Sequence, residues 1–91
     1  MNGRLIYKVE EGQRLMSLNL TVCDEEDLSH GSLSEIRRKR ILRILQEAKE
    51  QGCLLSYKDL KLILLSSLAT LKRDISYLRK QGMEVLIKNG R

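Results

Sequence analysis

The chain has 91 residues, of which 42% are hydrophobic and 32% are charged, and its net charge is +5 at pH 7. This length allows one small domain, and no apolar run approaches the roughly 20 residues that a membrane-spanning helix needs. The N-terminus lacks the basic and then apolar pattern of a signal peptide. We therefore expect a cytoplasmic protein with no membrane partner, and the lack of proline indicates a mainly helical interior.

The charge is distributed unevenly along the chain. Residues 1–36 carry three basic and seven acidic side chains, a net charge of −4, whereas residues 37–91 carry fourteen basic and five acidic side chains, a net charge of +9. A basic segment of this kind suggests an anionic partner. Charge alone does not separate this interpretation from a solvated basic surface without a partner.

The first 20 residues do not favour one kind of secondary structure. Residues 5–9, LIYKV, have the β-branched and aromatic character of a short strand. Residues 8–20 could equally form a helix, which Gly12 would weaken.

A short helix is predicted at about 22–30. Thr21 is a suitable N-cap, and the acids of DEED suit a first helical turn. Gly31 would end the helix in the left-handed conformation, and His30, the only histidine, would interact with the helix C-terminus. We expect residues 1–31 to form an acidic N-terminal extension, as a short helix or strand.

Residues 32–52 have the clearest helical pattern. Ser32 begins a capping-box signal, SLSE, apolar residues then recur at helical spacing, and Gly52 is placed to end the helix. The run RRKR lies near the start of this helix, where at most two of its four side chains share a face. A solvated surface is therefore a better prediction for this run than phosphate contact by Arg37 or Arg40.

A second capping-box signal, SYKD at 56–59, precedes a short helix predicted at about 57–64. Its apolar face is formed by Leu60, Ile63 and Leu64. Leu62 and Leu65 extend the apolar surface beyond what one face needs. We expect the N-terminal segment or another subunit to cover them.

Ser67 is the predicted N-cap of a third helix, which ends before Gly82. Apolar residues at spacings of three and four predict its buried side: Leu68, Leu71, Ile75 and Leu78. The opposite side carries Ala69, Arg73, Ser76, Tyr77 and Lys80, with Thr70 and Lys72 on the flanks. MEVLIK at 83–88 is a strand candidate, and NG at 89–90 is a hairpin-turn signal.

Two helices joined by so short a turn should cross steeply, as in a helix-turn-helix. The stretch SLATLKRDISYLRKQGMEV at 67–85 resembles the recognition helix and wing start of DeoR-type winged helix-turn-helix proteins. The matching positions are Ser67, Thr70, Leu71, Lys72, Arg73, Asp74 and Ile75, followed by Leu78 and Gly82. The resemblance covers about residues 54–91. The wider chain is similar to an uncharacterised prokaryotic family with the same order of acidic segment, basic helix and helix-turn-helix.

The resemblance implies a mainly α fold, in which residues 32–91 form a winged helix-turn-helix domain with a three-helix core and a short C-terminal β-strand or wing. Three positions depart from the DeoR-type pattern, since Lys61 replaces a small residue, Leu65 replaces a glycine of the turn and Ser66 replaces a valine. A left-handed leucine costs about 1 kcal/mol. Because the wing's return strand is missing, either the chain is truncated or residues 83–88 pair elsewhere, with residues 5–9 or a second chain.

By the same resemblance, the third helix would face DNA. The hydroxyls of Ser67 and Thr70 and the cations of Lys72 and Arg73 would point toward the duplex, Ala69 would allow close approach to base edges, and Asp74 would orient arginines. The full set of expected DNA-binding residues is Ser56, Lys58, Ser67, Ala69, Thr70, Lys72, Arg73, Ser76, Tyr77, Lys80, Lys88 and Arg91. Among them, Ser56 and Lys58 suit phosphate contact at a helix N-terminus, and Lys88 and Arg91 would belong to the wing.

Other chemistry is weakly indicated. Cys23 and Cys53 are expected to be inert packing residues, and no metal-ligand spacing surrounds His30. No phosphate-cradling glycine motif occurs, so we expect no metal, no cofactor and no enzymatic activity. Three tyrosines without Phe or Trp offer little stacking surface for single-stranded RNA.

The predicted function is sequence-specific binding of double-stranded DNA, by a transcriptional regulator or a mobile-element-associated DNA-binding module. A homodimer is expected, because one such module buries too little surface for tight binding alone. Leu62, Leu65 and the N-terminal segment could supply its interface. The alternative is a winged-helix protein–protein interaction module that does not bind DNA, which the unusual turn would suit.

Overall fold

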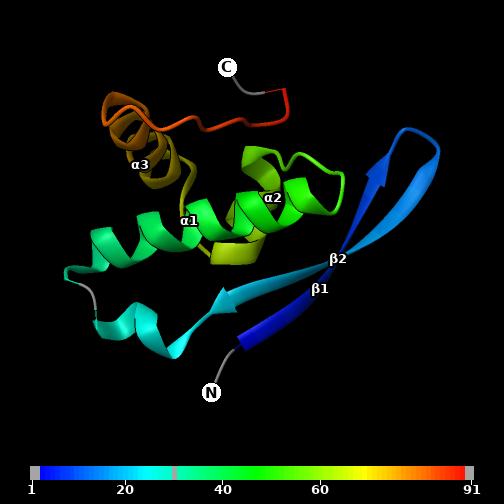
Figure 1. The fold of residues 1–91 in the computed structure, drawn as a ribbon. Helices are drawn as coiled ribbons and strands as arrows, with labels where there is room; N and C mark the ends of the chain where they lie inside the picture. The colour runs from blue at the N-terminus through cyan, green and yellow to red at the C-terminus, as the bar shows by residue number, and fades with distance from the viewer. Residues whose placement is uncertain (1–2, 30, 90–91) are drawn as a thin grey trace.

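A β-hairpin opens the chain and three α-helices follow it (Figure 1). The computed structural model describes residues 3–29 and 31–89. The elements are β1 (Gly3–Glu11), β2 (Arg14–Cys23), the 3-10 helix η1 (Glu25–Ser29), α1 (Leu33–Glu50), α2 (Tyr57–Leu64) and α3 (Leu68–Lys80). No helix in the described part of the chain is both long and apolar enough to cross a membrane.

The predicted fold class is wrong, because the order is β-β-α-α-α and the only described sheet is the N-terminal hairpin. Residues 1–31, predicted as an extension, supply Leu18 and Leu20 to the core, where each is at most 1% exposed. The winged helix-turn-helix prediction failed because it placed the sheet at 83–88. The strands form instead at the N-terminus. They include residues 5–9, the other strand candidate, and most of residues 8–20, which were equally compatible with a helix.

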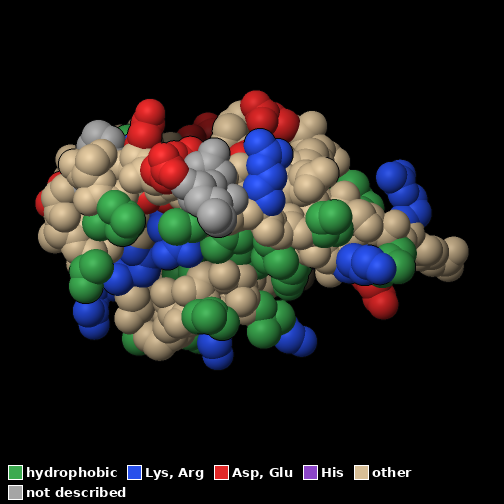
Figure 2. Space-filling model, turned by 90° about the horizontal axis from the view of Figure 1, so that it is seen from below, with side chains coloured by type: hydrophobic (Ala, Val, Ile, Leu, Met, Phe, Trp, Pro, Cys, Tyr) green, Lys and Arg blue, Asp and Glu red, His purple; other side chains and the backbone are tan. Residues whose placement is uncertain are grey.

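The hairpin turns at Gly12, whose φ of +66° suits the first central position of a type II′ turn. Antiparallel pairing then sets Tyr7 opposite Leu18 and Ile6 opposite Asn19. Side chains alternate between the core and solvent, so Leu18 is buried while Asn19 is exposed. The tip of the hairpin projects from the body of the molecule (Figures 1 and 2).

Side chains of α1 and of its C-cap residue Gln51 cover the outer edge of β2. The Asn19 N–H donates to Gln51 Oε1 and the Asn19 carbonyl accepts from Gln51 Nε2, both at 2.8 Å. The Thr21 N–H donates to Glu47 Oε1 at 2.6 Å, and the Thr21 carbonyl accepts from Arg43 Nε at 3.0 Å. These side chains take the place of a neighbouring strand, so this edge keeps its hydrogen bonds away from other chains.

A buried ion pair attaches η1 to α1. Asp27 is 1% exposed and accepts two hydrogen bonds from Arg43, Nη1–Oδ1 at 2.8 Å and Nη2–Oδ2 at 3.0 Å. The predicted helix at 22–30 with Thr21 as N-cap is therefore wrong. Thr21 lies within β2, and only the shorter η1 forms, because Asp27 turns inward to the arginine. His30 lies outside the described residues.

The predicted starts of the three α-helices are confirmed. Ser32 caps α1 by accepting from the Glu35 N–H at 3.3 Å, and Ser67 caps α3. Ser56 and Asp59 form a complete capping box at the start of α2. Local side-chain chemistry alone fixes these starts.

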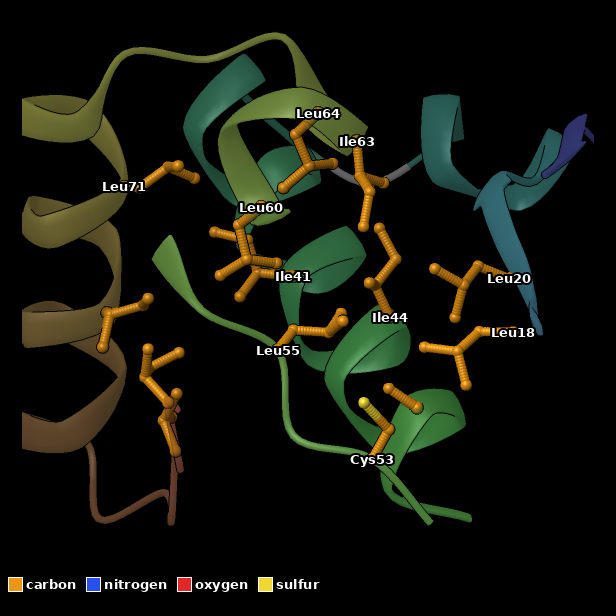
Figure 3. Close-up of a cluster of buried hydrophobic side chains, with 14 of the residues drawn as sticks. Leu18, Leu20, Ile41, Ile44, Cys53, Leu55, Leu60, Ile63, Leu64 and Leu71 are labelled. Carbon is orange, nitrogen blue, oxygen red and sulfur yellow. The ribbon is translucent and has the colours of Figure 1, made fainter. Parts of the chain in front are cut away.

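Leucine and isoleucine side chains from β2 and the three helices meet in one core (Figure 3). Leu18 and Leu20 point from β2 toward Ile44 on α1. Leu60 of α2 and Leu71 of α3 enter from the other side, and both are fully buried.

Tyr7 links β1 to α2 by a hydrogen bond, since its hydroxyl donates to Asp59 Oδ1 at 2.6 Å. Burial of the Tyr7 side chain, together with the nearby Asp59 carboxylate, raises the pKa of Tyr7.

The C-terminal segment forms no strand in the described structure, contrary to the prediction for 83–88. Val85 and Ile87 are buried, and the Lys88 N–H donates to the Leu55 carbonyl at 2.8 Å. The backbone of the segment is therefore bonded to the connection between α1 and α2, and no hydrogen bond among the described residues pairs it with residues 5–9. Part of the predicted hairpin turn at 89–90 lies outside the described residues.

Leu65 adopts the left-handed conformation in the turn between α2 and α3, with φ 55° and ψ 39°. Its side chain is 89% exposed, so it contributes little packing. We expect Leu65→Gly to raise the free energy of unfolding by up to about 1 kcal/mol, because glycine adopts this conformation without strain. Thermal denaturation measures the change. The control is Leu62→Gly, because Leu62 is also exposed but lies inside α2, and this variant should lower the free energy of unfolding by about 1 kcal/mol. An equal loss of stability in both variants would contradict a strained Leu65.

Candidate nucleic-acid interface

One side of α3 faces solvent along the length of the helix. Ala69, Arg73, Ser76 and Lys80 are exposed there, at positions that repeat every three to four residues. The opposite side is buried, as predicted, at Leu71, Ile75 and Leu78, whereas Leu68 remains 39% exposed. We call the exposed side, with Lys72 and Tyr77 at its margins, the outer face of α3.

The outer face of α3 and the exposed side of α2 are positively charged. The two helices contain only two acids, Asp59 and Asp74, and both are bonded within the protein. The exposed cations of the two helices are Lys58, Lys61, Lys72, Arg73 and Lys80. Because both carboxylates are bonded internally, the two helices themselves supply no free carboxylate to compensate these cations.

Asp74 fastens α3 to the start of α1. It is 1% exposed and accepts hydrogen bonds from Arg37 Nε, from Arg37 Nη2 at 3.1 Å and from Arg38 Nε at 3.3 Å. The hydrogen bonds that Arg37 donates to Asp74 raise the pKa of Arg37. Asp74 binds arginine side chains, as the resemblance implied, but the sequence did not reveal that these arginines lie on α1.

Three of the four side chains of the run RRKR bind other groups of the protein, so the predicted solvated surface is wrong for these three residues. Arg37 and Arg38 bind Asp74, and Arg40 Nε donates to the Val22 carbonyl at 2.7 Å. Lys39 alone of the four is exposed. Much of the positive charge of the C-terminal part therefore stabilises the fold instead of facing a partner.

Tyr77 has one side of its ring covered. The guanidinium of Arg38 lies 3.7 Å from the ring centroid, in a cation–π contact. The side chain remains 43% exposed, so its other side remains accessible at the margin of the outer face.

The serine hydroxyls expected to face DNA act as helix caps. Ser67 Oγ accepts from the Thr70 N–H at 3.2 Å and donates to Thr70 Oγ1 at 2.9 Å. Ser56 Oγ donates to Asp59 Oδ2 at 2.9 Å and accepts from the Asp59 N–H at 3.1 Å. The Thr70 hydroxyl accepts in its cap, so its own hydrogen can still be donated to a ligand.

The first turn of α2 lies beside α3. Lys72 Nζ is 5.7 Å from the centroid of the Tyr57 ring. The exposed side chains of Lys58 on α2 and Lys72 on α3 therefore belong to one surface. Lys88 points elsewhere, because its Nζ lies 3.4 Å from Glu11 Oε2 of the hairpin. Arg91 lies outside the described residues.

The described residues offer little support for other chemistry. They contain no group of three metal-ligating side chains. Cys53 is buried with Sγ 3.8 Å from Glu11 Oε2, and burial, together with that carboxylate, raises the pKa of its thiol. Cys53 is thus a packing residue, as predicted, whereas Cys23 is exposed.

The chain belongs to the family described as a protein of unknown function, DUF1670, whose family model matches residues 6–91. No curated protein and no solved structure matched the chain. The family match covers the hairpin and all three helices, and nothing in these comparisons links the chain to DeoR-type proteins.

Proposed function

We propose that the protein binds double-stranded DNA through the outer face of α3 and the first turn of α2, with transcriptional regulation as its role. The observation that carries the proposal is the charge of these two helices. Five exposed cations lie on them, and both of their carboxylates are bonded internally. A surface of this kind attracts a polyanion at long range and neutralises phosphates on contact.

The shape of the outer face suits a major groove, which admits one α-helix. Ala69 and Ser76 are small and exposed, so the helix backbone can approach the base edges there. Arg73 lies between them on the same side, where its guanidinium can bind the O6 and N7 acceptors of a guanine. Lys72 and Lys80 flank this centre and suit phosphate contact.

The attachment of α3 also supports the proposal. A helix that reads bases must be held in a fixed orientation, since a small displacement removes its hydrogen bonds. The bonds from Arg37 and Arg38 to Asp74 provide this rigidity on the buried side of α3. They leave Arg73, the adjacent residue, free to face solvent.

Protein–protein interaction is the second candidate function. The observation that favours it is the exposure of Leu62 and Leu65, at 59% and 89%, near the turn between α2 and α3. The N-terminal segment, expected to cover these residues, packs on α1 instead. Apolar exposure at this turn would suit a partner that buries leucine side chains.

Fluorescence anisotropy with duplex DNA of mixed sequence separates the two functions. We expect the logarithm of the affinity to fall linearly with the logarithm of salt concentration, with a slope of about −3 to −5, because each neutralised phosphate contributes about −0.9. Arg73→Ala should weaken binding by about 1–3 kcal/mol without lowering the melting temperature.

The control for this experiment is Lys39→Ala, which removes an exposed cation of α1 that lies off the two helices. It should leave the affinity for DNA nearly unchanged. Absent or salt-insensitive binding by the wild-type protein would favour protein–protein interaction. A loss of folding in Arg73→Ala would show that the outer face of α3 was assigned wrongly.

A further inference from the structure

The outer edges of β1 and β2 differ in whether other parts of the chain bind their backbone groups. The N–H and carbonyl groups of Asn19 and Thr21 point away from β1, toward the side chains of α1 that bind them. Ile6 is the cross-strand partner of Asn19, and Arg4 is the partner of Thr21. In an antiparallel pair such partners both turn their backbone groups outward, so Arg4 and Ile6 present theirs on the free side of β1.

Lys8 and Glu10 follow at the same two-residue period and also turn their backbone groups to the free side. Within the described part of the chain, no hydrogen bond to these outward groups is formed by backbone or side chain. The edge of β1 is therefore open over most of its length, while the edge of β2 is covered. An open edge of this kind is a template for another strand.

We infer that β1 of a second copy of this chain pairs antiparallel with β1, which joins two hairpins into a four-stranded sheet. Charge selects the register. A two-fold axis at Tyr7 sets Arg4 of one copy opposite Glu10 of the other, and Ile6 opposite Lys8. Moving the axis by one residue sets Arg4 opposite Lys8, or Lys8 opposite its own copy, so that like charges meet. An axis at Val9 also sets Lys8 opposite Glu10, but it shortens the overlap of the two strands to residues 7–11 and leaves Arg4 without a partner.

Apolar contacts favour the same register. Ile6 is 65% exposed and would gain the aliphatic stem of Lys8 as its neighbour. On the core side of the sheet, Leu5 of one copy would lie opposite Val9 of the other, and the two Tyr7 rings would meet at the axis. The contact is isologous, so each of these pairs occurs twice except the central one.

Sedimentation equilibrium of the full chain over a concentration series tests this dimer. We expect Arg4→Glu and Glu10→Arg each to raise the dimer dissociation constant about tenfold or more at low salt, because two attractive pairs become repulsive. Mixing the two variants should restore the wild-type affinity, since the reversed charges then meet. Hydrogen exchange at the Ile6 and Lys8 amides should slow as the wild-type concentration rises.

Arg73→Glu is the matched control, because it reverses an exposed cation of α3 far from β1 in the sequence. It should reduce DNA binding and leave dimerisation unchanged, so the dimer and the DNA interface are tested separately. A wild-type chain that stays monomeric through the series would overturn the inference. Single variants that dimerise as tightly as the wild type, or a mixture that regains nothing, would overturn it as well.

Discussion

Arg43→Met should lower the free energy of unfolding by about 3–5 kcal/mol, the usual cost of leaving a buried charge without its partner. Asp27 is 1% exposed and depends on Arg43 for two of its hydrogen bonds. Arg43 also donates to the Thr21 carbonyl, so the substitution weakens the attachment of the hairpin to α1. Urea denaturation followed by circular dichroism measures the loss.

The pH dependence of that loss identifies its cause. The hydrogen bonds from Arg43 hold the pKa of Asp27 below its ordinary value. The stabilisation is therefore complete above the unfolded pKa of about 4 and disappears as the pH falls through the lower folded pKa. The stability difference between wild type and Arg43→Met should shrink over that acid range. The double variant Arg43→Met/Asp27→Leu should recover most of the loss at neutral pH; no recovery would contradict a buried unpaired carboxylate.

Asp74→Ala should lower the free energy of unfolding by about 2–3 kcal/mol, the range for hydrogen bonds that involve charged groups. The cost is smaller than for Arg43, because Arg37 and Arg38 are each more than 20% exposed and can be hydrated after the change. Hydrogen exchange should become faster along α3, which loses its attachment to α1.

The exposed carboxylate of Glu84, just after α3, provides the control for Asp74. Glu84→Ala should change stability by less than about 0.5 kcal/mol. At a temperature where both variants are folded, Asp74→Ala should bind DNA more weakly than Glu84→Ala, because α3 loses the bonds to Arg37 and Arg38 that fix its orientation. A neutral effect of Asp74→Ala on stability would contradict its role in fastening α3.

Local signals made the three helices predictable. The capping box of Ser56 and Asp59, and the N-cap at Ser67, need only residues three positions apart, so they form without distant contacts. The similar signal at Thr21 failed because that residue pairs with Arg4 in the hairpin. The same holds for the outer face of α3, because helical periodicity separates Arg73 from Leu71 whatever the rest of the chain does.

The strand structure of the hairpin could not be predicted from the sequence of the hairpin alone. Residues 8–20 are compatible with a helix, and the β2 edge is stabilised by Gln51 and other side chains of α1 that come some 30 residues later. The partners of Asp74 are equally distant, since Arg37 and Arg38 precede it by 37 and 36 residues. Pairings at such separations depend on the packing of whole elements, which no local pattern records.

Amide chemical-shift mapping of the labelled protein with a duplex of mixed sequence tests DNA binding by α3 most directly. At low salt, we expect the largest shifts at Ala69, Arg73 and Ser76, with smaller ones at the start of α2 and none along β2. Shifts that centre on the hairpin, or no shifts at any DNA concentration used, would contradict the assignment of this surface to DNA.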